Sequence, residues 1–400
     1  MNKKKLFIKE TLRNSIPNIP FFQKILAHYR LKAFSIYDDI EKTVISSARK
    51  DDQDFKKGIV DICSQNWPAT AVKIRKTAES YLEKSAGFEG RSTDETLLTD
   101  ILYTYFGLGF SVEEYVSYGF ENRSVDERQE FLGDRQRIKH HFKLDNLIDS
   151  SVFTDKMRTY VKFQPYFKRT VLEIKTAKDY SNFKSFTDTH SEYVKKDVYG
   201  SYGRYVEHVD VVGCGKTVKE QFDEMIRNSK YVVEEVIHQS DLMAAVNESS
   251  VNTVRCITMM TREGINVPFG YFRIGKQGSF VDNTGSGGIV AGINMRNGVV
   301  ETIGRDEYAN SFELHPGSGV EFKGFQLPEW DQLLGIAREV ASQVSGCKTI
   351  GWDFAHTDKG WVMVEGNAMS QIGVQQIPYQ RGFRKDFERY FKEMEPIIKM

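Results

Sequence analysis

Residues 348–371 read KTIGWDFAHTDKGWVMVEGNAMSQ and carry the most informative pattern in this chain of 400 residues. Two apolar runs flank the sequence Thr-Asp-Lys-Gly, which is typical of the turn of a β-hairpin. With the turn centred near Asp358–Lys359, the position opposite Asp353 is residue 364 or 365. The pattern therefore predicts that Asp353 and Glu365 face each other across adjacent strands, about 5 Å apart.

Two acids that face each other in a strand pair need compensation, because ionised carboxylates about 5 Å apart repel by roughly 3 kcal/mol at an effective dielectric near 20. Either one of them binds a proton or a cation lies between them. Asn367 lies two residues after Glu365, on the same face of the strand. Asp353, Glu365 and Asn367 offer hard oxygen ligands that suit Mg²⁺, so we expect a metal site here. Two solvated acids on an edge strand are the alternative on spacing alone.

A second candidate is the segment 191–212, SEYVKKDVYGSYGRYVEHVDVV, in which Lys195 and Lys196 lead into a glycine-bearing loop. The residues of that loop that concern us are Gly200, Ser201 and Gly203. Glycine lets a backbone approach phosphate closely, and lysine supplies a point charge. The pattern favours a strand–loop–strand phosphate site, and an ordinary hairpin turn with solvated lysines stays open as the alternative.

Two further segments carry weaker signals. In residues 231–260, an apolar run ends in two acids before Asp241, and Asn252 and Arg255 open a later strand. A strand end can offer backbone groups to an adenine edge, an acid can bind ribose, and an arginine fork suits phosphate or carboxylate. The glycine-rich stretch DNTGSGG at 282–288 can line a ligand pocket. Taken singly, each residue of the first segment fits a surface charge better than a ligand, and the glycine-rich stretch taken alone fits a flexible hairpin loop.

The composition excludes several classes of function. Lys plus Arg and Asp plus Glu both number 55, so the formal net charge is zero, which argues against nucleic acid or an anionic membrane as the main partner. No run approaches the roughly 18 apolar residues of a membrane span, and no apolar run follows the basic start. We therefore expect a cytoplasmic protein. Four sparse cysteines fit ordinary, mostly buried thiols: Cys63, Cys214, Cys256 and Cys347.

The pattern of apolar and polar residues changes near residue 145. Before it, apolar residues recur at three- and four-residue spacing between charges, as in segments 21–34 and 37–50, and Ser111 and Ser124 are expected N-caps. After it, short β-rich runs alternate with glycine-rich turns and a few amphipathic helices. We expect a helical region at 1–145 followed by an α+β domain at 146–400.

The order of these segments resembles the ATP-grasp superfamily: a D-K-x-R segment at 155–158, a strand lysine, a glycine loop, a Glu-rich hinge, a downstream arginine and then D…E-x-N. Within it, VNTVR, DNTGSGGI, HPGSG, GFQLPEWD and IGWDFAHTDKGWVMVEGN resemble the sugar-transfer-associated ATP-grasp family. The resemblance covers roughly residues 100–385. It departs from the family pattern at Lys196, where many members have proline, and at Met369, where some have arginine.

The resemblance implies two α+β subdomains that clasp ATP, with a lid subdomain at about 185–233. Lys156 and Lys195 would contact the ATP phosphates beneath the 200–204 loop, and Arg255 would steady the transferring phosphoryl group. Asp353, Glu365 and Asn367 would hold Mg²⁺. The hinge residues expected to receive adenine and ribose are Glu234, Glu235, Val236, Ile237 and Asp241. The residues expected near the substrate are Asn252, Asp282, Asn283, Gly287, Gly288 and Arg381.

By the same resemblance, the expected activity is an ADP-forming ligase that activates a small or sugar-linked carboxylate as an acyl phosphate for attack by an amine. A surface-polysaccharide pathway, with a sugar acid or amino acid as acceptor, is the expected setting. A kinase acting on a hydroxyl and a nucleotide-binding scaffold are the alternatives, and a homo-oligomer stays open. Fold alone does not fix a substrate.

Overall fold

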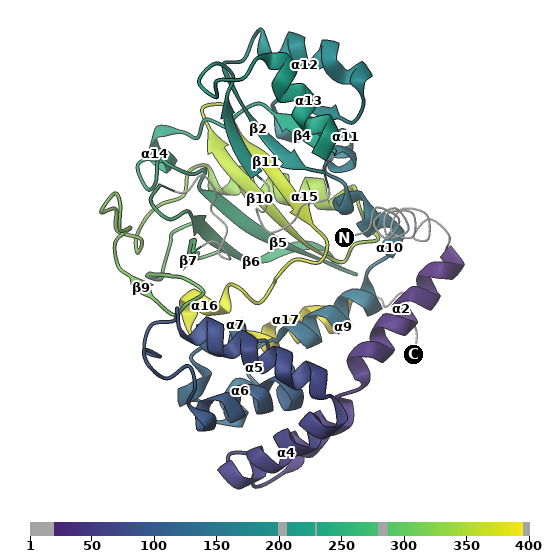
Figure 1. The fold of residues 1–400 in the computed structure, drawn as a ribbon, viewed down its shortest axis with the longest axis vertical. Coiled ribbons are helices and arrows are strands. Elements are labelled where there is room, and N and C mark those ends of the chain that lie inside the picture. Colours follow the sequence, from purple (N-terminus) through teal and green to yellow (C-terminus); the bar gives the residue numbers. More distant parts are fainter. Residues whose placement is uncertain (1–19, 199–205, 229, 279–286, 395–400) are drawn as a thin grey trace.

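The computed structural model describes residues 20–198, 206–228, 230–278 and 287–394, which form a helical layer and two antiparallel β-sheets (Figure 1). The mixture of helices with hairpin-connected strands confirms the α+β expectation. In Figure 1 the small sheet and its helices lie at the top, the large sheet in the middle, and the helical layer below it.

The N-terminal part is helical, as the apolar periodicity predicts. Ser111 and Ser124 both form capping boxes, with Glu114 and Glu127 at the reciprocal positions, which confirms both expected N-caps. The helices are α2 (Pro20–Ser35), α3 (Asp38–Ser46), α4 (Gln53–Asn66), α5 (Pro68–Leu82), α6 (Glu95–Leu108), α7 (Val112–Ser117), α8 (Val125–Arg128), α9 (Asp134–Leu144), α10 (Leu147–Ser150) and α11 (Lys156–Phe167).

The large sheet has the strand order β11-β10-β5-β6-β7-β8-β9. Its strands are β5 (Thr253–Thr261), β6 (Gly264–Ile274), β7 (Ile289–Gly292), β8 (Gly304–Arg305), β9 (Ser311–Phe312), β10 (Thr349–Thr357) and β11 (Gly360–Asn367). On one face, Phe272, Trp352 and Phe354 pack with Trp330 and Leu333 of helix α15 (Trp330–Ser342). The helical layer and the candidate site lie on the opposite face of the large sheet.

The helical layer and the large sheet share one hydrophobic core. Ile257 and Phe269 of the sheet lie in the same cluster as Phe106 of α6 and Phe387 of α17 (Arg384–Glu393). The short helix α16 (Gln376–Tyr379) packs against β7 and β8. Because the chain returns after β11 to insert these two helices, the N-terminal layer is tied to the sheet from both ends of the sequence.

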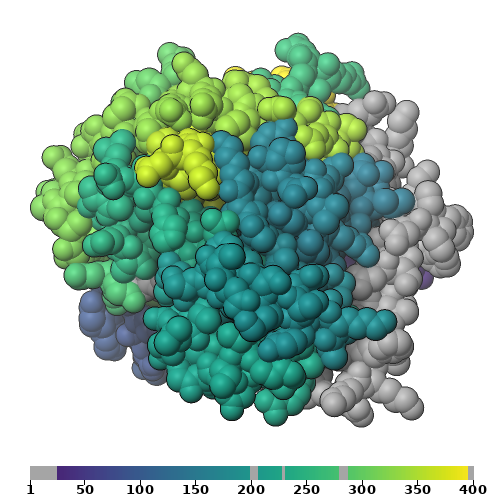
Figure 2. All heavy atoms as spheres, turned by 90° about the horizontal axis from the view of Figure 1, so that it is seen from above, coloured from purple at the N-terminus to yellow at the C-terminus, as the bar shows by residue number. Residues whose placement is uncertain are grey.

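The small sheet has the order β1-β4-β2-β3, built from β1 (Val171–Ile174), β2 (Glu192–Asp197), β3 (Val206–Asp210) and β4 (Tyr231–Glu234). Helices α12 (Tyr180–Thr187) and α13 (Val218–Asn228) cover one face through Phe183 and Phe222. Figure 2 looks down on the molecule from this end. The unit spans 171–234 and contains the expected lid range of 185–233.

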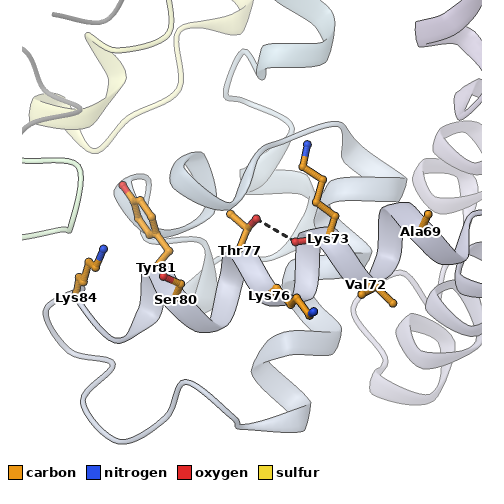
Figure 3. A pocket seen from close by; sticks show the side chains of 8 residues that line it. All are labelled: Ala69, Val72, Lys73, Lys76, Thr77, Ser80, Tyr81 and Lys84. Atoms are coloured by element: carbon orange, nitrogen blue, oxygen red, sulfur yellow. Dashed lines mark hydrogen bonds between the residues drawn. The ribbon is translucent and has the colours of Figure 1, made fainter. Parts of the chain in front are cut away.

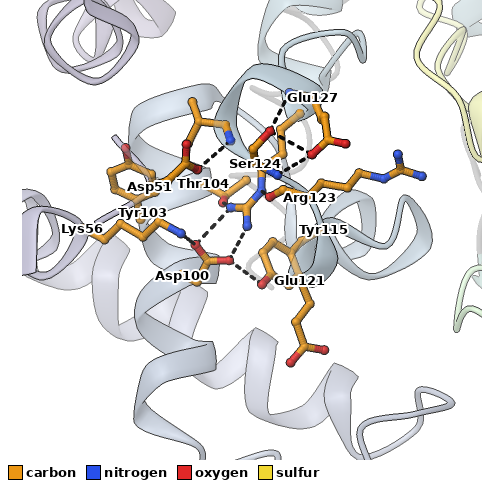
Figure 4. Close-up of polar contacts among 12 residues, drawn as sticks. Asp51, Lys56, Asp100, Tyr103, Thr104, Tyr115, Glu121, Arg123, Ser124 and Glu127 are labelled. Carbon is orange, nitrogen blue, oxygen red and sulfur yellow. Dashed lines mark hydrogen bonds and ion pairs between the residues drawn. The ribbon is translucent and has the colours of Figure 1, made fainter. Parts of the chain in front are cut away.

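A buried ionic network holds the helical layer together (Figure 4). The carboxylate of Asp100 accepts hydrogen bonds from Lys56 Nζ at 2.8 Å, Arg128 Nη2 at 2.7 Å and the Tyr115 hydroxyl at 2.6 Å. Asp100 is 6% exposed and Arg128 1%. Such a network fixes the packing of α4, α6 and α8, because removing one member leaves the others buried without a counter-charge.

Among the described residues, no helix is long and apolar enough to cross a membrane. Cys63, Cys256 and Cys347 are buried free thiols, as expected for most of the cysteines, whereas Cys214 is exposed. Burial raises the pKa of the Cys63 thiol to about 11, which makes that group inert at neutral pH.

Candidate active site

The β10–β11 hairpin forms with the predicted register. Asp353 pairs with Glu365, and Gly351 pairs with Asn367, so the three expected metal ligands share one face of the sheet. A β-bulge follows Asp353, where the partner of Phe354 becomes Met363. The bulge places one extra residue on β11, which explains why turn geometry alone left residues 364 and 365 both open as partners.

The positive charge beside Asp353 comes from two guanidinium groups, those of Arg255 and Arg273. Arg255 donates from Nε to Oδ1 at 2.5 Å and from Nη2 to Oδ2 at 2.7 Å, and Arg273 Nη1 donates to Oδ2 at 2.8 Å. Burial of Asp353 favours its neutral form, but Arg255 and then Arg273 outweigh this and hold the pKa of the carboxyl below its ordinary value. The compensation expected for the Asp353–Glu365 pair therefore comes from arginines of β5 and β6.

The three expected metal ligands differ in their partners and burial. The Asp353 carboxylate is committed to Arg255 and Arg273, whereas Glu365 and Asn367 are half-buried at the end of β11. No group of three or more His, Cys, Asp or Glu side chains suited to a metal occurs among the described residues. Asp353 thus has both oxygens engaged by arginines, and the metal role of the three residues stays a prediction.

Arg255 is buried, and its guanidinium donors are engaged by neighbouring side chains. It is 8% exposed, and beyond its bidentate contact with Asp353 its Nη1 donates to Ser370 Oγ at 3.0 Å. Burial would lower the pKa of Arg255, but Asp353 raises it well above its ordinary value. These contacts tie Arg255 to Asp353 and to the chain after β11, and its expected role at the phosphoryl group stays a prediction.

Three charged side chains meet where the two sheets join. Glu234 of β4, 5% exposed, accepts from Lys196 Nζ at 2.9 Å and from Arg169 Nη2 at 2.8 Å. Arg169 Nη1 also donates to the Met363 carbonyl of β11 at 2.6 Å, which links the small sheet to the large one. Burial disfavours the Glu234 anion, but Lys196 and Arg169 outweigh this and lower its pKa to about 2.

Lys156 joins this cluster from the first turn of α11, where Asp155 caps the helix and the Lys156 amide meets the Val198 carbonyl at 3.4 Å. Burial lowers the pKa of Lys156, the charge of Glu365 opposes that shift, and Lys196 adds to it. Lys156 therefore interacts with both Glu365 and Lys196. We define the Lys156–Lys196–Glu365 cluster by these three residues, and it combines the expected lysine and metal positions in one place.

Lys195, the strand lysine expected from the sequence, lies on the opposite face of β2 from Lys196, and its phosphate role stays a prediction. Side chains alternate across β2, and Tyr193 lies in the core beneath α12 and α13, so Lys195 shares that face. Lys195 Nζ pairs with Glu207 at 2.8 Å, far from the Glu234 contact that Lys196 makes. The sequence alone does not show which of the adjacent residues Lys195 and Lys196 faces the junction of the two sheets. The answer depends on which face of β2 packs against the core.

The expected hinge follows β4 as an irregular, half-buried segment. Glu234 is buried in the cluster described above, and Glu235 pairs back to Thr170 through both its amide and its carboxylate. Val236 and Ile237 follow as half-buried residues outside any helix or strand. Asp241 is exposed at the start of the four-residue helix α14 (Asp241–Ala244). The hinge residues lie beside Glu234, at the edge of the lysine cluster.

The structure describes four of the expected substrate residues. Asn252 is fully buried, and its amide nitrogen donates to the Met243 and Asn247 carbonyls, so it braces a loop, while its Oδ1 has no partner among the described residues. Arg381 is exposed and lies over the Phe383 ring at 4.4 Å. Gly287 adopts a φ of 82°, a conformation that favours glycine, and Gly288 follows it. Gly200, Ser201, Gly203, Asp282 and Asn283 lie outside the described residues.

Sequence reasoning missed Arg137, which ties the helical layer to the site. Its Nη1 donates to the Met369 carbonyl at 2.9 Å and the Ser370 carbonyl at 3.2 Å, and Asp134 holds its Nε at 2.9 Å. Ser370 in turn contacts Arg255. The partners lie more than 200 residues apart in the chain, so no local sequence signal could reveal this clamp.

A cavity of about 590 Å³ runs along α5, away from the lysine cluster (Figure 3). Its lining side chains include Lys73, Lys76 and Tyr81. Figure 3 shows that Lys73 and Lys76 point in opposite directions and do not converge on a common point. A second void of about 20 Å³ lies beside Met369 and Ser370 and has room for a single water molecule.

No curated protein matches the chain. Similar solved structures include a D-alanine–D-alanine ligase from Coxiella burnetii (11% identity, TM-score 0.37, 63% of this chain and 60% of that chain). They also include D-alanyl-alanine synthetase A from Vibrio cholerae (10%, 0.41, 63% and 68%) and the ATP-grasp ligase PsnB (11%, 0.37, 62% and 62%). The match thus spans less than two thirds of the Coxiella enzyme's length.

A family model described as "Sugar-transfer associated ATP-grasp" matches residues 139–390, more than half of the chain. The matched range includes α11, both sheets and every residue of the Lys156–Lys196–Glu365 cluster. The chain therefore belongs to the sugar-transfer-associated ATP-grasp family and has the ATP-grasp fold, with a helical layer packed against its large sheet.

Proposed function

We propose that this protein is an ATP- and Mg²⁺-dependent ligase that activates a carboxylate for attack by an amine and releases ADP. The observation that carries the proposal is the contact network at the junction of the two sheets. Lys196 pairs with Glu234 at 2.9 Å, and Arg169 ties Glu234 to the Met363 carbonyl, two residues before Glu365. The Lys156 amide meets the Val198 carbonyl, two residues after Lys196. Two lysines beside a carboxylate suit the phosphates of a metal-bound nucleotide, because the lysines meet phosphate oxygens and the carboxylate meets the metal.

The charge balance of the junction supports an anionic ligand. Five cationic side chains interact there with four carboxylates. The cations are Lys156, Arg169, Lys196, Arg255 and Arg273, and the carboxylates are Asp197, Glu234, Asp353 and Glu365. A bare divalent cation would add to an existing excess of positive charge, whereas a nucleotide brings its own negative charge. The residues fit Mg²⁺ bound together with ATP, with Glu365 and Asn367 as its protein ligands.

When bound, the nucleotide supplies the phosphoryl group that turns a carboxylate into an acyl phosphate. Lys156 and Lys196 would hold the phosphates, and the irregular segment at Val236 and Ile237 would receive adenine. Asp353, clamped by Arg255 and Arg273, keeps the β10–β11 hairpin rigid behind Glu365. Catalysis by such residues is mainly positioning and charge neutralisation, since little covalent chemistry falls to the protein.

Membership of the sugar-transfer-associated family supports an acceptor in surface-polysaccharide synthesis, such as a sugar acid or an amino acid coupled to an amine. This finer assignment rests on the family alone. A kinase that phosphorylates a sugar hydroxyl would use the same nucleotide half of the site, so the acceptor decides between the two.

Trapping with hydroxylamine tests the proposal. The full-length protein is incubated with ATP, Mg²⁺, hydroxylamine and a panel of uronic and amino acids, and both hydroxamate and ADP are measured. An acyl phosphate is a mixed anhydride that hydroxylamine captures, whereas a sugar phosphate ester is inert to it. Hydroxamate with matching ADP supports the ligase. ADP with a stable phosphorylated sugar and no hydroxamate would replace it with the kinase, and AMP with pyrophosphate would contradict both.

A further inference from the structure

Arg305 lies on the same face of the large sheet as the candidate active site. Arg305 of β8 pairs with Val290 of β7, and Val290 pairs with Arg273 of β6. Directly paired residues of antiparallel strands point to the same face, so Arg305 shares the face of Arg273 and Asp353. Two strand spacings separate Arg305 from Arg273, which is about 10 Å in the direction away from Glu365.

The Arg305 guanidinium has no counter-charge among the described residues. Its Nε is buried and makes no hydrogen bond, and burial is the cause that lowers its pKa. The adjacent acid Asp306 is committed elsewhere, since its carboxylate accepts from the amides of Tyr308 and Asn310. Within the part of the chain that the structure describes, the buried Nε of Arg305 is a donor without an acceptor, and an anionic ligand would satisfy it.

Gln375 supplies a second polar side chain without a partner. It is 1% exposed, and neither its amide nitrogen nor its amide oxygen makes a hydrogen bond. The next residue, Gln376, is fully engaged: its oxygen accepts from the Leu132 amide, and its nitrogen donates to the Leu132 carbonyl. Gln375 directly precedes α16, which packs against β7 and β8.

Helix α16 lies on the active-site face of the sheet. Gly292 of β7 pairs with Tyr271, and Tyr271 pairs with Arg255, so all three share this face. A Cβ added at Gly292 would lie 2.5 Å from the ring of Tyr379 in α16, so glycine is what allows the helix to approach so closely. Arg305 and the start of α16 are thus placed together at one end of this face.

We propose that Arg305 and Gln375 form an acceptor subsite that binds an anionic group, a carboxylate or a phosphate, on the substrate. The proposal rests on the proposed function and extends it. Five strand spacings, about 24 Å, separate β11 from β8, so the acceptor is an extended molecule with its reacting carboxylate near Glu365 and a second anionic group near Arg305. Arginine forms a bidentate contact with either anion, and the Gln375 amide adds a donor. The acceptor class is therefore an acid with at least two separated anionic groups.

Binding without turnover tests this subsite. Succinate and glycerol phosphate are titrated separately into the full-length protein saturated with Mg-ADP, and heats are measured for wild type, Arg305→Gln and Arg296→Gln. Arg296 is an exposed arginine in the turn after β7 and serves as the matched control. At least one probe should bind wild type and Arg296→Gln equally and Arg305→Gln at least about tenfold more weakly, as loss of a charge-assisted contact implies. The probe that binds identifies the group as carboxylate or phosphate.

Equal affinity in wild type and Arg305→Gln, or no binding of either probe to wild type, would overturn the subsite. Failure of wild type to bind Mg-ADP would instead contradict the proposed function, so the two outcomes are distinguishable. A second variant separates a ligand site from a structural role: Arg305→Met should melt at the same temperature as wild type or higher, because it removes an uncompensated cation. A lower Tm would show that Arg305 supports the fold and would also overturn the subsite.

Discussion

The Arg255 guanidinium holds both oxygens of the Asp353 carboxylate, with Nε 2.5 Å from Oδ1 and Nη2 2.7 Å from Oδ2. Asp353 is 3% exposed, and a third contact comes from Arg273. The acid opposite it, Glu365, is half-buried and interacts with Lys156. The two carboxylates paired across the hairpin therefore differ in environment, and we expect them to differ in role.

Asp353→Asn and Glu365→Gln should have different consequences. Asp353→Asn leaves two buried guanidinium groups without a counter-charge and should lower the free energy of unfolding by about 3–5 kcal/mol. Glu365→Gln removes a ligand charge at a half-buried position, so stability should be nearly unchanged while ADP formation falls by about a hundredfold or more. Urea unfolding and an ADP assay measure the two effects. Near wild-type turnover of Glu365→Gln at modest Mg²⁺ would reject its role.

The adjacent lysines of β2 provide a matched pair. Lys196→Met removes the positive charge next to Glu234 on the junction face and should weaken binding of a non-hydrolysable ATP analogue by about tenfold to a hundredfold. Lys195→Met removes a contact with Glu207 on the other face of β2, away from the Glu234 contact, and should leave that affinity within about threefold. Calorimetric titration with Mg²⁺ present measures both. A larger loss in the Lys195 variant would reverse the assignment.

Glu234 gives the fold an acid-sensitive contact. Its pKa in the folded protein is about 2, against an ordinary value of 4.5. A lowered pKa means that the ionised group stabilises the fold fully above about pH 4.5, and that this contribution of about 3 kcal/mol is lost as the pH falls toward 2.

The expected result is a steep fall in the free energy of unfolding of the wild type between pH 4.5 and 2, and a shallower one in Glu234→Gln. Urea unfolding at a series of pH values measures the slopes, and Glu248→Gln, at an exposed position, is the control. Parallel slopes for wild type and Glu234→Gln would show that the Glu234 contacts with Lys196 and Arg169 do not persist in solution.

The network of Figure 4 predicts a second stability effect, distant from the site. Asp100→Asn leaves Lys56 and Arg128 buried without their counter-charge and should cost about 3–5 kcal/mol. Asp126→Asn removes the exposed partner of Lys50 and should cost no more than about 1 kcal/mol. Thermal melting of the two variants compares them directly. A small effect of Asp100→Asn would mean that water enters the network.

The sequence predicted the parts of the fold that depend on local patterns. Turn residues between two apolar runs predicted the β10–β11 hairpin and narrowed the partner of Asp353 to residue 364 or 365, and serines followed by glutamates marked two helix starts. These features depend on residues within about ten positions of each other, so their physical causes are visible in the sequence.

The remaining features of the site depend on contacts between distant segments. Arg273 reaches Asp353 across 80 residues, and Arg137 reaches Met369 across 232. The choice between Lys195 and Lys196 depends on which face of β2 packs beneath α12 and α13. Asn252 reads as a polar surface residue, but its partners are backbone carbonyls that only the folded loop supplies. No spacing rule contains this information.

The central claim is that Mg-nucleotide binds at the Lys156–Lys196–Glu365 cluster, and metal binding tests it most directly. Mn²⁺, used as a spectroscopic substitute for Mg²⁺, is titrated into wild type and Glu365→Gln with and without ADP, and free Mn²⁺ is measured by electron paramagnetic resonance, with ADP alone as the blank. Because the junction carries an excess of positive charge, wild type should bind Mn²⁺ tightly only with ADP present, and Glu365→Gln should bind it at least about tenfold more weakly. Equal binding of Mn²⁺ with and without ADP, or equal binding by both proteins, would contradict the account.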